Sequence, residues 1–176
     1  MGLRRQAREV ALQALFVCDF SGKWSTKIVD ETFSHFGVAP SVKPFAEKLT
    51  NGAIEKISEI DTELTKSSQN WSITRMSRVD RCILRVACYE ILFLADVPNS
   101  VAINEAIEIS KKYSADDSPS FVNGVLDRLA SVSKLSSKVE SIARPAVVAP
   151  DVLKSREEKN REEKSREEEL ESILLD

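Results

Sequence analysis

Apolar residues recur every three or four positions along most of the first 132 residues, which is the spacing of amphipathic helices. No run alternates between apolar and polar residues in the way of a half-buried strand. The pattern therefore predicts an all-α fold with short connections. The expected helices span about residues 4–20, 25–36, 41–57, 78–95, 100–113 and 118–132, and the polar residues 58–72 fit either a helix or a loop.

Small polar residues, glycine and proline place the ends of these helices. Ser25 or Thr26 is expected to cap the second helix, which Gly37 ends. Ser100 is expected to cap the helix over residues 100–113, and Ser118 followed by proline is a cap-and-first-turn signal for the last helix.

The helix expected over residues 78–95 is apolar on most of its sides, which is typical of the central helix of a bundle. Glu90 falls in the middle of its apolar stripe. A buried carboxylate must be paired or hydrogen-bonded, so the pattern predicts an ion pair with an arginine such as Arg75 or Arg78. In the last helix, Gly124 predicts a close approach between two helices.

The character of the chain changes after Leu135. Residues 136–155 are rich in serine and then contain prolines, which favours a linker, and residues 156–176 are charged and repetitive. The repeat has a five-residue step that keeps no single face on a helix, so we expect this tail to be disordered or a fraying helix. The predicted organisation is a helical domain over residues 1–135, a linker and a charged tail.

Charge is distributed unevenly along the chain, whose net charge is −3. Residues 151–176 hold 6 basic and 10 acidic residues, a balance of −4, and the other 150 residues hold 19 and 18, a balance of +1. The first eight residues carry three arginines and no carboxylate. The domain is therefore not acidic, and its start is basic.

Little in the sequence points to catalysis, metal binding or a membrane. The chain lacks a phosphate loop, a dinucleotide-binding glycine motif, a nucleophile elbow and a metal-ligand cluster. Cys18, Cys82 and Cys88 lie in apolar helical patterns, so we expect core thiols in a reducing cytosol. The longest apolar runs are too short to cross a bilayer. We expect a cytoplasmic protein without enzymatic activity, cofactor or metal.

The first helix raises the main question about function. On a helical wheel one face holds Leu3, Ala7, Val10, Ala11, Ala14 and Cys18, the other side holds Arg5, Arg8, Leu12, Phe16 and Phe20, and Arg4 lies at the border. Cations are disfavoured at a helix N-terminus because the backbone dipole is positive there. Arginines beside free backbone N–H groups form an anion site, for which phosphate is the usual ligand. The alternatives are a solvated basic end or arginines paired with carboxylates elsewhere.

Aromatic positions suggest two further contacts. Leu12 and Phe16, with Phe20 beyond them, form an apolar strip on the outward side. The strip favours a protein partner, although another helix of the same chain could cover it. Phe121 lies at the rim of the core face of the last helix, beside Asp117. It could stack on an unpaired base or be an aromatic residue at the edge of the core.

Three stretches together resemble the NusB family of transcription antitermination factors: RRQAREVALQALF, VDRCILRVACYEIL and DVPNSVAINEAIEISKKYSADDSPSFVNGVLDRL. They occur in the family's order across about residues 4–130, whereas residues 21–72 match weakly and the charged tail lies outside the pattern. The resemblance implies a compact helical bundle of two packed helical subdomains. It also implies binding to the single-stranded boxA element of nascent ribosomal RNA together with NusE, a small-subunit ribosomal protein. Other Nus factors and RNA polymerase would be indirect partners.

The resemblance assigns roles to individual residues. The RNA-binding positions carry over onto Arg4, Arg5, Arg8, Asp117, Ser118 and Phe121. Phe16 and Asp80 correspond to NusE contacts, and Leu12 joins them as part of the outward strip. The family's basic run is often basic at the position of Gln6, so we expect a weaker RNA site here.

Two other functions stay open on the sequence. A similar domain precedes some RNA cytosine methyltransferases, but no cofactor-binding α/β domain follows here, so that function would require a separate catalytic subunit. A helical adaptor that binds only protein would use the Leu12–Phe16 strip and would show no RNA affinity.

Overall fold

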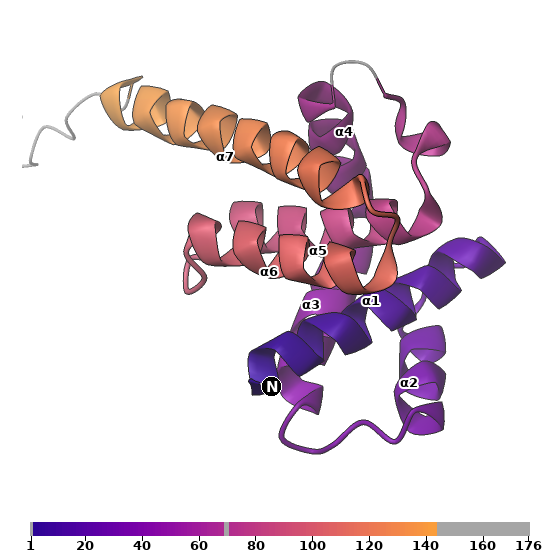
Figure 1. The fold of residues 1–176 in the computed structure, drawn as a ribbon. Helices are drawn as coiled ribbons and strands as arrows, with labels where there is room; N and C mark the ends of the chain where they lie inside the picture. Colours follow the sequence, from indigo (N-terminus) through magenta and orange to yellow (C-terminus); the bar gives the residue numbers. More distant parts are fainter. Residues whose placement is uncertain (1, 69–70, 144–176) are drawn as a thin grey trace, which may run out of the picture. The chain divides into compact units, whose positions relative to one another are not determined.

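The computed structural model describes residues 2–68 and 71–143, with side chains through Ser133. This part of the chain forms seven α-helices and one 3-10 helix and contains no strand (Figure 1). The elements are α1 (Leu3–Ser21), α2 (Thr26–His35), α3 (Lys43–Glu55), α4 (Ile57–Ser67), η1 (Ile73–Arg75), α5 (Arg78–Phe93), α6 (Asn99–Tyr113) and α7 (Ser118–Ala143). The all-α prediction is confirmed, and most of the ambiguous stretch 58–72 is helical.

Residues 1–135 form one compact unit. Within this unit, α1 packs against α2, α3 and α5 (Figure 1). Its side chains therefore divide between two hydrophobic clusters. Ala7, Ala14 and Cys18 pack with α2 and α3, whereas Leu12 and Leu15 join the larger cluster.

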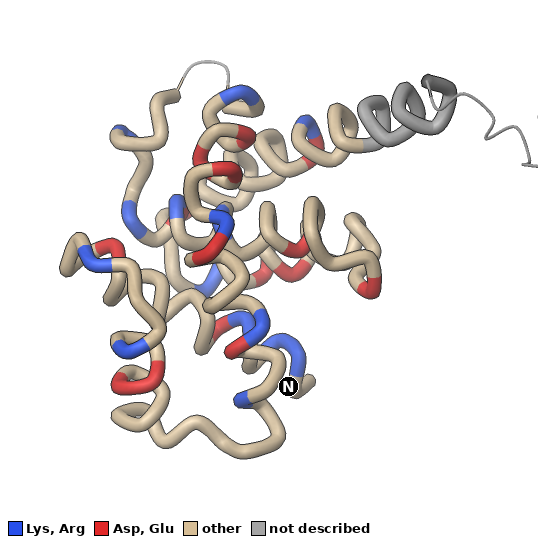
Figure 2. The backbone as a smooth tube through the Cα atoms, turned by 180° about the vertical axis from the view of Figure 1, so that it is seen from behind, with Lys and Arg blue, Asp and Glu red and all other residues tan. Residues whose placement is uncertain are grey.

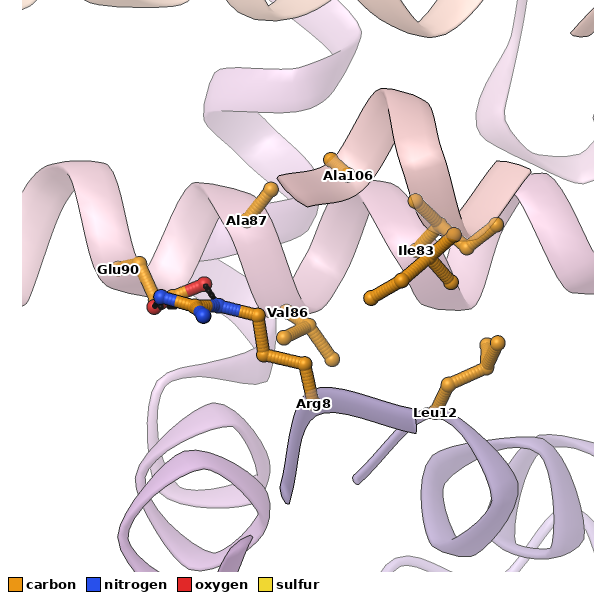
Figure 3. Close-up of a pocket in the computed structure, with 8 residues that line it drawn as sticks. Arg8, Leu12, Ile83, Val86, Ala87, Glu90 and Ala106 are labelled. Carbon is orange, nitrogen blue, oxygen red and sulfur yellow. Dashed lines mark hydrogen bonds and ion pairs between the residues drawn. The ribbon is translucent and has the colours of Figure 1, made fainter. Parts of the chain in front are cut away.

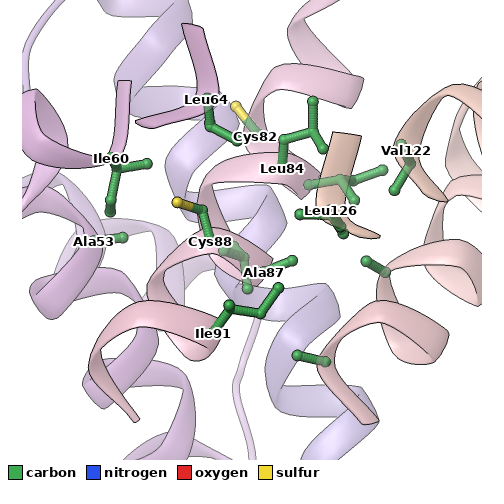
Figure 4. Close-up of a cluster of buried hydrophobic side chains, with 14 of the residues drawn as sticks. Ala53, Ile60, Leu64, Cys82, Leu84, Ala87, Cys88, Ile91, Val122 and Leu126 are labelled. Atoms are coloured by element: carbon green, nitrogen blue, oxygen red, sulfur yellow. The ribbon is translucent and has the colours of Figure 1, made fainter. Parts of the chain in front are cut away.

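The larger cluster is built around α5, as expected for a helix that is apolar on most sides. Figure 4 shows Leu84 of α5 on the side of Val122 and Leu126 of α7, and Cys88 of α5 on the side of Ile60 of α4. Helices α1 and α3 contribute side chains to both clusters. The helices around the two clusters form the expected bundle of two packed groups. None of the helices in the described part of the chain is both long enough and apolar enough to span a bilayer.

The helix ends agree only in part with the local signals. Ser25 caps α2 by accepting a hydrogen bond from the Ile28 N–H. Ser100 does not cap α6, which begins one residue earlier, after Pro98. The hydroxyl of Ser118 donates to the carboxylate of Asp80 at 3.2 Å.

Helix α7 continues to Ala143, so the first eight residues of the predicted linker are helical. Serine is only mildly unfavourable in a helix, and neither proline nor glycine occurs between Gly124 and Pro145. The rest of the predicted linker and the charged tail lie outside the described residues.

Close packing between helices occurs at a different glycine from the one predicted. A Cβ atom on Gly52 of α3 would overlap the phenol ring of Tyr89 on α5, whereas a Cβ on Gly124 would meet no atom within 4 Å. Gly52 thus allows α3 and α5 to approach each other, and the expectation for Gly124 is wrong.

Candidate functional site

Arg8 lies in the interior of the bundle. Its Nε and Nη2 groups donate to both carboxylate oxygens of Glu90 at 2.7–3.0 Å, and the two side chains are only 3% and 1% exposed. Figure 3 shows Arg8 and Leu12 pointing from α1 toward α5 and α6. The prediction that Arg8 and Leu12 lie on an outward side is therefore wrong. The predicted ion pair of Glu90 exists, but its partner is Arg8 rather than Arg75 or Arg78.

The position of α1 explains this error. A helical wheel with one buried face describes a peripheral helix, but α1 has neighbours on several sides. The cavity beside Arg8 and Leu12 measures about 10 Å³, which leaves no room for a ligand larger than one water molecule. Burial raises the pKa of the Glu90 carboxyl, and the hydrogen bonds and charge of Arg8 oppose that shift.

Arg5 and Arg4 remain at the surface but also have acidic partners. Arg5 donates through Nε and Nη2 to the two carboxylate oxygens of Glu105 on α6, each at 2.7 Å. Its side chain is 38% exposed, and its hydrogen bonds lower the pKa of the Glu105 carboxyl. The Nη2 of Arg4 lies 3.7 Å from a carboxylate oxygen of Asp96, and both side chains are at least half exposed.

Three carboxylates thus balance the three arginines at the start of α1. They come from α5, from α6 and from the loop between these helices. This pairing explains how the helix tolerates cations in its first turns. Figure 2 shows acidic and basic positions interleaved through the bundle rather than a face of one sign. Glu105 occupies two of the five N–H donors of Arg5, so donors remain for a further anion.

A groove of about 320 Å³ brings together the three residues predicted at the start of the last helix. We call it the aromatic groove; its lining residues are Trp71, Arg75, Met76, Ser77, Asp80, Ala115, Asp117, Ser118 and Phe121. Asp117 is exposed, Phe121 is half-buried and Ser118 is buried. The hydroxyl of Ser118 is directed at Asp80, and the place of this residue in an RNA surface stays a prediction.

Asp80 is a buried carboxylate that connects the start of α5 to the end of α6 and the start of α7 through hydrogen bonds. Its oxygens accept hydrogen bonds from the hydroxyls of Ser77, Ser114 and Ser118, and its N–H donates to the Ser77 hydroxyl at 3.0 Å. Ser77 is the N-cap of α5, and the other two serines connect Asp80 to the segment that ends α6 and begins α7. Asp80 is 8% exposed and its carboxylate is hydrogen-bonded within the chain, so its contact with a partner protein stays a prediction.

Trp71 and Arg75 are residues of the groove that the sequence did not identify. The rings of Trp71 and Phe121 lie 6.2 Å apart in an edge-to-face arrangement, and the guanidinium of Arg75 lies 5.4 Å from the centre of the Trp71 ring. Both residues fall in the polar stretch before α5, which has no helical period. A tryptophan isolated among serine, asparagine and glutamine was the only available signal.

A second surface lies along the end of α1. The ring of Phe16 is half-buried against the larger cluster, whereas Phe20 is 67% exposed. Their rings stack at 6.4 Å, and the guanidinium of Arg78 lies 5.0 Å from the centre of the Phe20 ring. The apolar strip therefore begins inside the bundle at Leu12 and reaches solvent at Phe20. We call Phe16 and Phe20 the phenylalanine pair.

Ionic contacts fix α1 behind this pair. Asp19 accepts hydrogen bonds from Arg81 at 2.6 Å and from Arg85 at 2.7 Å. Arg85 also binds Asp61 of α4 through two bonds of 2.8 Å. Burial alone would raise the pKa of the Asp19 carboxyl, but the hydrogen bonds of the two arginines outweigh it and lower that pKa.

Among the residues whose side chains are described, no group of three His, Cys, Asp or Glu side chains is arranged to hold a metal ion. The three cysteines are buried and free. Burial raises the pKa of the Cys82 thiol to about 12, so this thiol is protonated at neutral pH and is a poor nucleophile.

Comparison with known proteins identifies relatives for most of the chain. The model of the NusB family matches residues 5–131. A transcription antitermination protein NusB of Geobacter sulfurreducens is 47% identical over 133 residues, which cover 74% of this chain and 96% of that protein. A protein of the same name from Desulfitobacterium hafniense is 44% identical over 138 residues, 77% of this chain and 93% of the relative.

Solved structures agree with the sequence comparison. A NusB structure from T. maritima has a TM-score of 0.67 and 39% identity, and the match covers 73% of this chain and 90% of that one. A structure of the antitermination factors NusB and NusE in complex with dsRNA gives a TM-score of 0.68 and 27% identity, with coverage of 74% and 97%.

Proposed function

This chain belongs to the NusB family, and from that premise we propose that it is a transcription antitermination factor. It would bind boxA-type single-stranded RNA in nascent ribosomal RNA transcripts together with NusE and help to assemble an antitermination complex on RNA polymerase. The observation that carries the proposal is the family match over residues 5–131, which includes both surfaces described above. The solved complex of NusB and NusE with dsRNA supports NusE and RNA as the classes of partner.

The proposed RNA surface consists of the aromatic groove and the exposed arginines of α1. Arg4 and Arg5 would contact phosphates through the donors that Asp96 and Glu105 leave free. Phe121 would stack on a base. Arg8, Asp117 and Ser118 also belong to the proposed RNA site, but Arg8 and Ser118 would act from the interior, because Arg8 holds α1 against α5 and Ser118 holds the start of α7 in place.

The proposed NusE surface is the phenylalanine pair at the end of α1. Phe20 is exposed although it is a large apolar side chain, and the adjacent Phe16 extends its ring surface. Aromatic residues are enriched at the centres of protein interfaces. Leu12 would support this surface from below, and Asp80 would act on it indirectly by fixing the start of α5. We propose a non-enzymatic protein that acts in the cytoplasm, where transcription takes place.

The test is a filter-binding titration with boxA-type RNA at several salt concentrations. Arg5→Ala should weaken binding by about 10-fold or more, because a hydrogen bond between charged groups is lost. The slope of log affinity against log salt should flatten by about 0.7, the value for one phosphate contact of a single strand. Lys27→Ala on α2 removes an exposed cation of the same charge and should change neither quantity. An unchanged affinity in Arg5→Ala would contradict the proposed RNA site.

One observation favours a second function, an adaptor that binds only protein. All three arginines at the start of α1 have acidic partners, which weakens their attraction for phosphate. That function requires Phe16→Asp to abolish NusE binding while the wild-type protein shows no measurable affinity for RNA, alone or with NusE. RNA binding by the wild-type protein would exclude it.

A further inference from the structure

The aromatic groove contains two residues, Trp71 and Arg75, whose positions are not explained by the packing of the bundle. Trp71 is 49% exposed. Phe121, its neighbour across the groove, packs against the larger hydrophobic cluster, but Trp71 does not belong to either cluster. About half of the Trp71 side chain is therefore left in solvent, and large exposed aromatic surfaces mark binding sites.

The backbone of Trp71 is nevertheless held firmly. Its N–H donates to the carbonyl of Ser68 at 2.9 Å, and its carbonyl accepts a hydrogen bond of 2.8 Å from the Ser68 hydroxyl. Ser68 is itself buried. The chain thus fixes the backbone on both sides of the indole, and the ring is presented at the groove from an anchored position.

Arg75 is the cation of this groove. It is exposed, and it makes no ion pair with a carboxylate among residues 2–68 and 71–133, in contrast to Arg78 and Arg81, which pair with Asp19. Its guanidinium lies against the Trp71 ring. A charge that is stacked but not neutralised is available to an anionic ligand.

We propose that Trp71 and Arg75 form a subsite for one unpaired nucleotide of single-stranded RNA. Trp71 stacks on the base and Arg75 binds an adjoining phosphate. Stacking on an aromatic ring beside a basic group is the usual way in which proteins hold single strands. A groove of about 320 Å³ lies at the small end of ligand sites, which suits one nucleotide.

Asp117 sets the orientation of the nucleotide in this subsite. Its exposed carboxylate lies in the same groove and repels phosphate, so the backbone of the strand is placed on the side of Arg75. The same carboxylate can accept a hydrogen bond from an exocyclic amino group of a base. The subsite therefore takes the base beside Trp71 and the phosphate beside Arg75. This inference rests on the proposed function, because it assumes that the chain binds RNA.

The experiment uses the intrinsic fluorescence of the full-length protein. The chain has two tryptophans, and Trp24 lies elsewhere, with the Arg85 guanidinium 4.8 Å from its ring centre. The Trp71→Phe variant removes the signal of Trp71 while keeping a ring that can stack. The difference between wild-type and Trp71→Phe emission therefore reports on Trp71 alone, and filter binding measures RNA affinity independently.

Single-stranded boxA-type RNA should quench the emission of Trp71, and saturating NusE without RNA should not. Trp71→Ala should weaken RNA binding by about 5- to 150-fold, the range for losing one stacked base, and Trp71→Phe should retain most of the affinity. Arg75→Ala should flatten the salt dependence by about 0.7, whereas Lys27→Ala should not. Circular dichroism and thermal melting establish that each variant is folded.

The outcomes separate this inference from the proposed function. If RNA binds and Arg5→Ala weakens it, but Trp71→Ala leaves the affinity unchanged and emission does not respond, the subsite is refuted and the function stands. If emission responds to NusE and not to RNA, the groove is a protein site and the inference is refuted. If no RNA binds to the wild-type protein with or without NusE, the proposed function itself fails.

Discussion

Replacing Arg8 with alanine is expected to destabilise the bundle far more than replacing the neighbouring Arg5. The substitution leaves the Glu90 carboxylate, which is 1% exposed, without its three hydrogen bonds. Breaking a buried ion pair by removing one partner costs about 3–5 kcal/mol, and a domain is stable by only about 5–15 kcal/mol. Arg5 and Glu105 are partly exposed, and a pair of that kind is worth about 1 kcal/mol or less.

Urea denaturation followed by circular dichroism measures the effect. With a slope of about 2 kcal/mol per molar urea, Arg8→Ala should lower the midpoint by roughly 2 M and Arg5→Ala by less than about 0.5 M. The double variant Arg8→Met with Glu90→Leu removes both charges and should lie close to the wild type, because replacing a buried pair by apolar groups is often neutral. A loss below about 1 kcal/mol in Arg8→Ala would refute the reasoning.

The loss of stability caused by Arg8→Ala should also depend on pH. Burial places the folded-state pKa of Glu90 above its unfolded-state value, and removing Arg8 raises it further. A carboxyl whose folded-state pKa is raised destabilises the fold as pH rises through the window between the two values, and the penalty is complete above it. The loss of stability relative to the wild type should therefore be largest at neutral pH and shrink in acid, where Glu90 is neutral and needs no partner.

Three further changes test other parts of the structure. Gly52→Ala should destabilise by about 1–3 kcal/mol in urea denaturation, because its methyl group meets the ring of Tyr89, whereas Gly124→Ala should be neutral or stabilising. The wild type should lose stability as pH falls below about 4, in part through the lowered pKa of Asp19, and Asp19→Asn should show a flatter acid profile because it lacks that contribution. Glu105→Gln should tighten RNA binding up to about 5-fold in filter binding at low salt, because Glu105 and RNA phosphate compete for Arg5 and the exposed ion pair is worth about 1 kcal/mol. An unchanged affinity would show that Glu105 does not compete with RNA.

Helical periodicity located most of the elements, because most helices bury an apolar face, but it left α4 undecided between helix and loop. The predicted core positions of α7, such as Val122 and Leu129, are buried, and α5 is the central helix that its composition indicates. Helix ends were less predictable. They depend on single hydrogen bonds, and the hydroxyl of Ser118 is taken by a carboxylate from a distant part of the chain.

The charged residues of the candidate site could not be placed from the sequence. A helical wheel shows which residues share a side but not which sides are covered, and α1 is covered on several. The partners of Arg5 and Arg8 are 100 and 82 positions away in the sequence, so no local pattern predicts them. Trp71 and Arg75 were missed for the opposite reason, since they lie in a stretch with no period at all.

Binding of NusE and boxA-type RNA by the same molecule, through two separate surfaces, tests the central claim most directly. Isothermal titration calorimetry compares the wild type with Arg5→Ala and Phe20→Asp. Each ligand is titrated alone and in the presence of the other. Arg5→Ala should weaken RNA binding and leave NusE binding intact, Phe20→Asp should do the reverse, and the wild type should bind RNA more tightly with NusE present. If both variants retain wild-type affinity for both ligands, the two surfaces are not the binding sites and the account is wrong.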